Sequence, residues 1–540
     1  MIRKLLAFVL AMSASGGTAQ APAVLPDDQA AMKAHVLFLA SDAMRGREAG
    51  SPEYDIAAQY VAAQFFAAGL RPAGDAGGYL QAVPLVRYAA ASEGAFVWTP
   101  RRRGAARRLV FGTDYIPAAN PVTAAAAVTA PVIFVGYGIR APQYGHDDYR
   151  SVDVRGKIVA YVGGAPATFG GEERAFFGSP RIKAQGAAAL GAVAVIQIAG
   201  PGATAAESAR SASGYRTPRM TWARADGTGQ ADAPIPLLGT LTPAGAAKLF
   251  ADAPVSWAAI VAQAGRVAPR YRTTVLAGIL SARTTSVLTA ARSSNVVGMI
   301  PGSDPDIGGE VVVLSAHLDH IGVTPDGAGD RINNGALDNA IGIASLIEEA
   351  KRFKASGVAP KRTILFLAVT AEEKGLIGSD YFAQHPTVPR ETIVADVNLD
   401  MPILTYRFED MIVFGAERST LGPIVRDAVE AVGVALSPDP SPELGIFVRS
   451  DHFRFVQQGI PSVFLWPGAK GAGKAATGAF MANCYHKPCD DLTQPILWDQ
   501  GVRFVDVNYR IARAIADGPA RPVWNRGDYF GTLYKGPMAK

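Results

Sequence analysis

Apolar residues in the second half of the chain gather in short runs that have the length of buried strands. The predicted strands are Asn295–Ile300, Glu310–Ala316, Thr363–Thr370, Ile393–Leu399, Met411–Phe414 and Ser462–Trp466. Stretches with helical character separate several of them, for instance Ala340–Phe353. This alternation predicts an α/β fold whose mixed, largely parallel sheet is sandwiched by helices.

The first half of the chain has a different pattern. Helices are predicted over Ala30–Leu39 and Asp55–Ala68. From about Val122 to Ala268 the chain consists of short β-rich runs separated by turns, such as "PVIFVGYGI", "GKIVAYVGG" and "GAVAVIQIAG". This section contains few candidate catalytic residues.

Polar residues collect where the predicted strands of the second half end. His317, Asp319 and His320 follow one strand, Glu372 and Glu373 follow the next, and Asp400 follows a third. Asp338 precedes a helical run, and Tyr485-His486 comes near the end of the chain. Folds of this class place their chemistry outside the carboxyl ends of the strands, so these side chains are expected to meet there.

A metal centre accounts for this set of side chains better than separate structural roles do. Taken alone, Asp338 has the position of a helix cap and the two glutamates that of a solvated helix start. Imidazole mixed with carboxylate suits zinc, and less specifically cobalt or manganese. The set is larger than one ion requires, and two ions that share one aspartate would use all of it. His35, His146 and His385 have no such neighbours and are interpreted as structural.

The first 20 residues of the chain and its two cysteines indicate export. Residues 1–20 combine a basic start, a short apolar run and small residues, which is the pattern of a signal peptide. Cys484 and Cys489 are expected to form a local disulfide, and a thiolate metal site is the alternative. The formal net charge is only +5, and the arginines at 101–103 and 107–108 are interpreted as a solvated loop. We therefore expect a periplasmic or extracellular protein with no nucleic-acid partner and no membrane contact after signal cleavage.

Six motifs between Ser293 and Leu492 resemble those of the M28 family of zinc aminopeptidases. They are "AHLDH", "NNGALDNAIG", "AEEKGLIGS", "NLDM", "RSDHFRF" and "NCYHKPCD". The stretch from Leu39 also resembles the N-terminal part of bacterial members, and the β-rich section resembles the protease-associated (PA) domain that some members carry. The resemblance implies a zinc exopeptidase-like fold with an inserted PA domain. Its expected ranges are 1–20 signal peptide, 21–118 and 271–520 peptidase domain, 119–270 insertion and 521–540 tail.

The resemblance also implies a role for each site residue and a cofactor of two Zn²⁺ ions per chain. His317 and Asp400 would bind one ion, Glu373 and His486 would bind the other, and Asp338 would bind both. The peptide bond between Asp338 and Asn339 would be cis. Glu372 would be the general base that deprotonates a metal-activated water. Asp319 would accept a hydrogen bond from His317, while Tyr485 and Arg449 would help bind the substrate or its oxyanion. His320 would be a neighbour, because the family's ligand set is complete without it.

The leading functional hypothesis is an exported metallopeptidase that hydrolyses the N-terminal peptide bond of peptides with a free N-terminus. The alternatives are a carboxypeptidase of the glutamate-carboxypeptidase type, a glutaminyl cyclase-like enzyme, and a binding protein that has lost its metals. A chain of the last kind should lack several ligands, and none is missing here. The inserted section is expected to pack separately, to shape access to the metals and to supply no catalytic residue.

Overall fold

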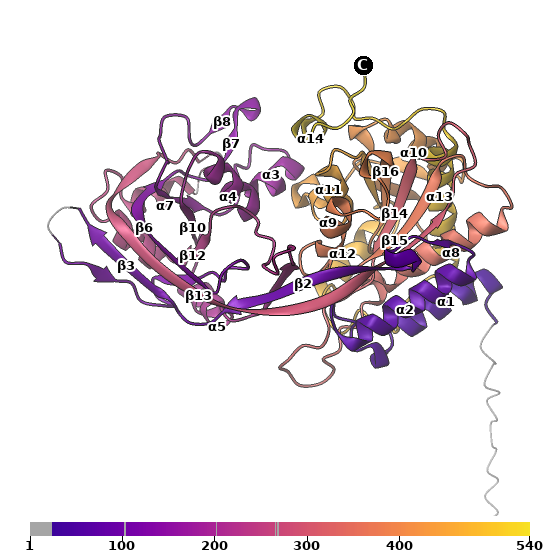
Figure 1. The fold of residues 1–540 in the computed structure, drawn as a ribbon, viewed down its shortest axis with the longest axis horizontal. Helices are drawn as coiled ribbons and strands as arrows, with labels where there is room; N and C mark the ends of the chain where they lie inside the picture. The colour runs from indigo at the N-terminus through magenta and orange to yellow at the C-terminus, as the bar shows by residue number, and fades with distance from the viewer. Residues whose placement is uncertain (1–23, 102–103, 201, 265, 267–268) are drawn as a thin grey trace, which may run out of the picture.

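The computed structural model describes residues 24–101, 104–200, 202–264, 266 and 269–540. The predicted signal peptide lies outside the described residues, as do Arg102 and Arg103 of the arginine-rich loop. Among the helices of the described ranges, none has both the length and the apolar character needed to cross a membrane. The chain folds into two units joined by long strands (Figure 1).

The first unit, residues 24–90 and 286–540, is built on a mixed sheet. Its strand order is β11, β2, β13, β15, β14, β16, β19, β17 and β18 (Ala435–Ser437). The four strands at its centre are parallel: β15 (Thr363–Val369), β14 (Val311–His317), β16 (Ile393–Leu399) and β19 (Ser462–Pro467). Antiparallel neighbours follow on either side, including β13 (Thr274–Ile300), β2 (Leu80–Ala90) and β17 (Asp410–Phe414). The predicted α/β fold class is confirmed.

Helices cover both faces of this sheet. One face carries α1 (Asp27–Leu39), α2 (Pro52–Ala67), α8 (Ile341–Ala355), α10 (Leu421–Glu430) and α13 (Trp498–Asp517). The other face carries α9 (Ile377–Gln384) and α11 (His452–Val456). Helix α8 turns Ile343, Leu346, Ile347, Ala350 and Phe353 towards the sheet, a spacing of three and four residues. Burying each large apolar side chain of this kind contributes about 1.5–3 kcal/mol.

The second unit, residues 91–285, contains its own sheet. The strand order is β5 (Tyr115–Pro117), β12 (Leu237–Leu241), β10 (Ala194–Ile198), β9 (Ile158–Val162), β6 (Ala125–Phe134), β13, β3 (Ala95–Pro100) and β4 (Arg107–Arg108). Helices α4 (Pro180–Ala189), α6 (Pro243–Phe250) and α7 (Trp257–Ala264) accompany it. Strands β3 to β5 of this unit precede residue 119, so the unit begins earlier in the chain than the insertion was expected to begin.

Strand β13 belongs to both sheets. Residues 274–285 pair with β6 and β3, residues 286–296 pair with β2, and residues 296–300 pair with β15. The short strand β11 (Arg219–Trp222) of the second unit also pairs with β2 in the first sheet. Figure 1 shows β13 and β2 running together from one unit to the other.

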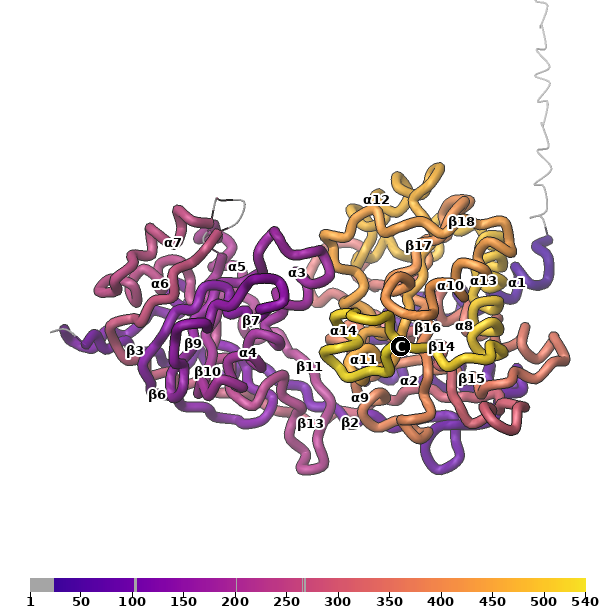
Figure 2. The backbone as a smooth tube through the Cα atoms, turned by 90° about the horizontal axis from the view of Figure 1, so that it is seen from above, coloured from indigo at the N-terminus to yellow at the C-terminus, as the bar shows by residue number. Residues whose placement is uncertain are grey.

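The two units also share one hydrophobic core. Phe176 of α3 (Gly171–Gly178) lies 6.3 Å from Phe453 and 5.4 Å from Phe530, measured between ring centroids. Next to these rings, Arg418 of the first unit pairs with Glu172 of α3. Seen from above, α3 reaches towards α14 (Tyr529–Leu533) (Figure 2). The second unit thus packs partly by itself, in a cluster that includes Ile133, Val159 and Val195, and partly against the first unit, because its other apolar residues complete a core to which both units contribute.

Candidate metal centre

The predicted site residues meet at the carboxyl edge of the first sheet. His317 is the last residue of β14, Glu372 and Glu373 follow β15, and Asp400 directly follows β16. Because these three strands are parallel neighbours, their carboxyl ends lie side by side. Asp338 reaches the same place from the segment before α8, and His486 from the loop after α12 (Gly473–Asn483).

The first ligand cluster consists of His317, Asp338 and Asp400. The Nε2 atom of His317 lies 3.0 Å from Oδ1 of Asp400 and 3.2 Å from Oδ1 of Asp338. On the other side of the ring, Nδ1 donates to the backbone carbonyl of Asp319 over 3.1 Å. A proton on Nδ1 leaves the lone pair of Nε2 facing the carboxylates, which is the arrangement that a metal-binding imidazole needs.

The second ligand cluster lies on the other side of Asp338. Oδ2 of Asp338 is 3.3 Å from Nε2 of His486, and the same nitrogen is 3.1 Å from Oε2 of Glu373. Nδ1 of His320 is 2.7 Å from Oε1 of Glu373 and 3.9 Å from Oδ2 of Asp338. The two oxygens of Asp338 thus face different clusters, and His320 belongs to the second.

A cation fits this arrangement of side chains. Asp338, Asp400 and Glu373 are buried or nearly so, yet the buried guanidinium of Arg47 donates to backbone carbonyls, including that of Asp338, and not to their carboxylates. Among the described residues, Oε1 of Glu373 and both ring nitrogens of His320 are buried without a hydrogen-bond partner. Buried polar atoms normally have partners, and buried carboxylates need a positive charge. The donor set of imidazole and carboxylate is one that zinc accepts.

The first unit carries a known peptidase signature. Residues 295–512 match the family model Peptidase family M28. This region contains every predicted metal ligand and both glutamates that follow β15. The match supports the predicted enzyme class, a zinc-dependent metallopeptidase.

Two curated relatives each match part of the chain. Leupeptin-inactivating enzyme 1 of Streptomyces exfoliatus is 30% identical over 229 residues, which are 40% of this chain and 47% of that protein. A probable leucine aminopeptidase 2 of Aspergillus oryzae is 31% identical over 217 residues, 37% of this chain and 40% of that protein. The chain thus spans less than half the length of either relative.

One solved structure that this chain matches is the aminopeptidase from Aneurinibacillus sp. strain AM-1. It is 19% identical, with a TM-score of 0.49, and the match covers 91% of this chain and 95% of that one.

The two adjacent glutamates of the M28 region have different surroundings. Glu373 is part of the second cluster, whereas Glu372 is in neither cluster. The N–H of Glu372 donates to Oδ1 of Asp319 over 3.0 Å, and Ala371 before it has a left-handed backbone, with φ of 54°. Burial raises the pKa of Glu372 well above its usual range, and the neighbouring carboxylates Glu373 and Asp451 raise it further, against the effect of His317. The turn therefore separates one carboxylate that can bind a metal from one that is free to exchange a proton.

Asp319 contacts His317 through its backbone. The resemblance implied a hydrogen bond between Asp319 and the imidazole, and it is the backbone carbonyl of Asp319 that accepts it. The carboxylate instead holds the N–H of Glu372. Asp319 consequently links the histidine strand to the glutamate turn, and burial raises its pKa to about 6.

The remaining predicted residues lie around the clusters. The ring of Tyr485 stacks on His486 with centroids 3.8 Å apart, and burial together with nearby carboxylates raises the pKa of its hydroxyl. Arg449 is exposed and directly precedes Ser450. The disulfide between Cys484 and Cys489 is present, and so is the cis peptide bond between Asp338 and Asn339. Both predictions are confirmed.

Several residues that hold the ligands in place were not predicted. Ser450 donates to Oδ2 of Asp400 over 2.6 Å, and Asp490 accepts from the N–H of Asp338 over 3.0 Å. Arg47 binds the carbonyls of Leu318 and Gly335. Ser450 lies in the "RSDH" motif, where only Arg449 was singled out. Arg47 gave no signal, because it acts on backbone carbonyls far from it in the sequence.

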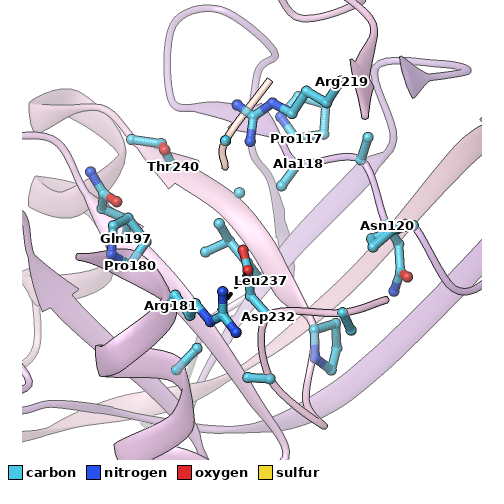
Figure 3. A pocket seen from close by; sticks show the side chains of 18 of the residues that line it. Pro117, Ala118, Asn120, Pro180, Arg181, Gln197, Arg219, Asp232, Leu237 and Thr240 are labelled. Carbon is cyan, nitrogen blue, oxygen red and sulfur yellow. Dashed lines mark ion pairs between the residues drawn. The ribbon is translucent and has the colours of Figure 1, made fainter. Parts of the chain in front are cut away.

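A large cavity lies between the two units. It measures about 1730 Å³ and is lined mainly by the second unit, including Arg181 and Asp232, whose side chains are 3.8 Å apart (Figure 3). The first unit contributes Lys374 and Gly375, which directly follow Glu373, as well as Asp380 and Arg454. The cavity therefore ends against the turn that carries the two glutamates, and no predicted metal ligand lines it.

Proposed function

We propose that this chain is an exported two-zinc aminopeptidase. The observation that carries the proposal is Asp338, whose two carboxylate oxygens face two separate groups of buried ligands. The match of residues 295–512 to peptidase family M28 supports the reaction class. The leader pattern at residues 1–20 and the disulfide between Cys484 and Cys489 support export to an oxidising compartment.

The chain offers ligands for both ions. His317 and Asp400 would bind one, Glu373 and His486 the other, and Asp338 would bridge them. Bound zinc lowers the pKa of water towards about 7 and polarises a carbonyl group. Every remaining function in hydrolysis falls to side chains of the protein.

Glu372 is the proposed general base. Burial raises its pKa, and a carboxylate with a raised pKa accepts a proton more readily than an ordinary one does. It would take a proton from water as the oxygen attacks the scissile carbonyl carbon. The same proton would pass to the amine as the C–N bond breaks, so that the products are a free amino acid and a shortened peptide.

Tyr485 and Arg449 are proposed to act on the substrate. The hydroxyl of Tyr485 stays protonated because burial and four carboxylates raise its pKa, so it can donate to the oxygen of the tetrahedral intermediate. Arg449 is exposed at the segment that also holds Asp400 through Ser450. Its charge is available to a substrate that approaches from solvent.

The second unit is proposed to restrict access to the site. Its cavity ends at Lys374 and Gly375, directly after the glutamates. A second unit placed beside the metal site would narrow the access to it and would favour short peptides over folded proteins as substrates. All proposed ligands and proton-transfer groups lie in the first unit, in agreement with a role for the second unit in selection and not in catalysis.

The proposal is tested by metal content and by the position of cleavage. The purified protein should contain two equivalents of zinc and lose activity when a chelator removes them. It should release the first residue from a peptide with a free amine and spare its N-acetylated copy. Cleavage of the acetylated peptide together with protection by a C-terminal amide would indicate a carboxypeptidase, and one equivalent of metal would argue against the shared site.

A further inference from the structure

We propose that His320 is a fourth protein ligand of the second metal site, which makes that site closed. This inference rests on the proposed two-zinc function. The closed site would comprise Asp338, Glu373, His486 and His320, whereas the first has three protein ligands in His317, Asp338 and Asp400. Four protein ligands are typical of structural zinc sites, and three are typical of sites where chemistry takes place.

The distances agree with four ligands around one point. Zinc bound at about 2.0–2.1 Å in a tetrahedron holds its ligand atoms about 3.3 Å from one another. In the second cluster the ligand atoms are separated by 3.1 Å and 3.3 Å at His486, and by 2.7 Å and 3.9 Å at His320. Each oxygen of Glu373 faces one of the two histidines. The two histidine rings are 5.8 Å apart between centroids, so both fit on this side of Asp338.

His320 has no other partner that would explain its place. Its side chain is fully buried, and neither ring nitrogen makes a hydrogen bond to any described residue. Nδ1 lies close to Oε1 of Glu373, but the two atoms do not meet in hydrogen-bond geometry, and that oxygen also lacks a partner. Two atoms that lie this close without bonding to each other can both bind a cation placed to one side of them.

The position of the ring is built into the surrounding backbone. Gly335 has φ of 60°, and a Cβ at this position would lie 2.6 Å from Cγ of His320. The backbone of His320 also forms a parallel bridge with Glu48. A glycine therefore makes room for the imidazole, and the bridge fixes its backbone, which holds the ring towards Glu373 without help from a hydrogen bond.

A closed second site would divide the work between the ions. With four protein ligands it should bind zinc more tightly and fill first. The first site, with fewer protein ligands, would exchange its ion more readily and would be the place where the reacting groups gather.

The number of imidazoles at the second site decides the question. In a His317→Ala variant, loaded with one equivalent of zinc, the second site alone should be filled. X-ray absorption should then show two imidazoles per zinc, and one in the His317→Ala/His320→Ala double variant. Competition with a chromogenic chelator should show zinc affinity at this site falling at least tenfold on the second substitution. One imidazole in both proteins would overturn the inference and leave His320 as a group that only orients Glu373.

A second measurement guards against a variant that does not fold. In the otherwise unaltered protein with both sites filled, His320→Ala should reduce the count from three imidazoles per two zinc ions to two. His35→Ala is the matched control, because His35 is also buried but bonds to Tyr60 and Glu348 away from the site, and its count should stay at three. If the unaltered protein fails to bind two zinc ions, the proposed function itself is wrong. An unchanged count in His320→Ala refutes the fourth ligand alone.

Discussion

At the scale of single residues, the site depends on giving chemically identical groups different tasks. Glu372 and Glu373 are neighbours in sequence, yet only the second lies within reach of His486 and His320. The backbone turn at Ala371 and the hydrogen bond from the N–H of Glu372 to Asp319 set this difference. Substitution of each glutamate by its amide should therefore separate proton transfer from metal binding.

Glu372→Gln is expected to retain both zinc ions and to lose activity by about 100- to 10,000-fold, the contribution typical of a general base. The amide keeps the shape of the side chain but cannot accept a proton. The measurement is kcat on an aminoacyl-anilide, with zinc content determined on the same sample. Activity near that of the unaltered enzyme would remove Glu372 from the mechanism.

Glu373→Gln is the matched variant for metal binding. It should lower the zinc affinity of one site by more than the roughly 10- to 100-fold that follows loss of a group that merely orients a ligand. Elemental analysis after dialysis should find about one zinc per chain. Two zinc ions retained under the same conditions would show that the roles of the two glutamates are assigned wrongly.

His452 should make the fold sensitive to acid. Its imidazole is fully buried between Phe447 and Phe464, and burial lowers its pKa to about 3. The unfolded chain, with a pKa near 6.5, takes up the proton first, so stability is fully present above about pH 6.5 and is lost as the pH falls towards 3. The loss attributable to this group reaches about 3 kcal/mol by pH 4.

The check is a comparison of zinc-free protein with zinc-free His452→Leu in urea at pH 7 and pH 4. The leucine variant should lose less stability between the two conditions. Equal losses in both proteins would mean that His452 is protonated in the folded state.

At the scale of elements, the sequence predicted the bounds of a strand or helix well where the whole element packs in a single sheet or against a single core. β14, β15, β16 and α8 were predicted to within one or two residues, because they are continuous apolar or amphipathic segments. For β13 only Asn295–Ile300 was predicted, although the strand begins at Thr274. Its first part alternates buried and exposed residues and contains many threonines and serines, a pattern that a loop between turns also shows.

The residues of the candidate site also divide into those that the sequence predicted and those that it did not. Ligands that follow strands, such as His317 and Glu373, could be found from the strand pattern and the motifs. His320 could not be assigned to a cluster, since one turn of backbone decides which way its ring points. The supports Arg47 and Asp490 act through backbone groups, and backbone contacts leave no pattern in the sequence.

Strand β11 joins the second unit to the helix that follows the glutamate turn. Nε1 of Trp222 donates to Oδ2 of the buried Asp380 in α9 over 2.8 Å. Trp222→Phe should lower the free energy of unfolding by about 1.5–3 kcal/mol, because it removes a hydrogen bond to a charged group and leaves that charge short of a donor. Denaturant unfolding measures the change.

Asp380→Ala, which removes the acceptor, and the double variant complete the comparison. Removing both partners should cost less than the sum of the single losses, with a coupling of about 0.5–3 kcal/mol. Additive losses would show that the contact between β11 and α9 contributes no stability of its own.

At the scale of the whole molecule, the two units are parts of one folding unit. The second unit has a buried cluster of its own, which includes Ile133 and Val195. Its larger aromatic cluster is shared, because Phe176 and Phe177 of α3 pack with Phe447, Phe453 and Phe530 of the first unit. Strand β13 runs without interruption through the boundary. Removal of residues 91–285 would expose these rings and leave β2 without its partner strand β11, so a shortened chain should be insoluble.

The intact protein should therefore unfold in a single step, although its length is that of two or three average domains. Differential scanning calorimetry of the zinc-loaded protein should give one transition, with the van't Hoff and calorimetric enthalpies close to equal. Far-ultraviolet circular dichroism and tryptophan fluorescence should report the same midpoint. Arg418→Ala breaks the partly buried ion pairs with Glu172 and Asp528 at the boundary and should move the single transition to lower temperature. Two resolved transitions in the unaltered protein would show that each unit is stable alone, and that the shared aromatic cluster is a contact surface between two independent cores.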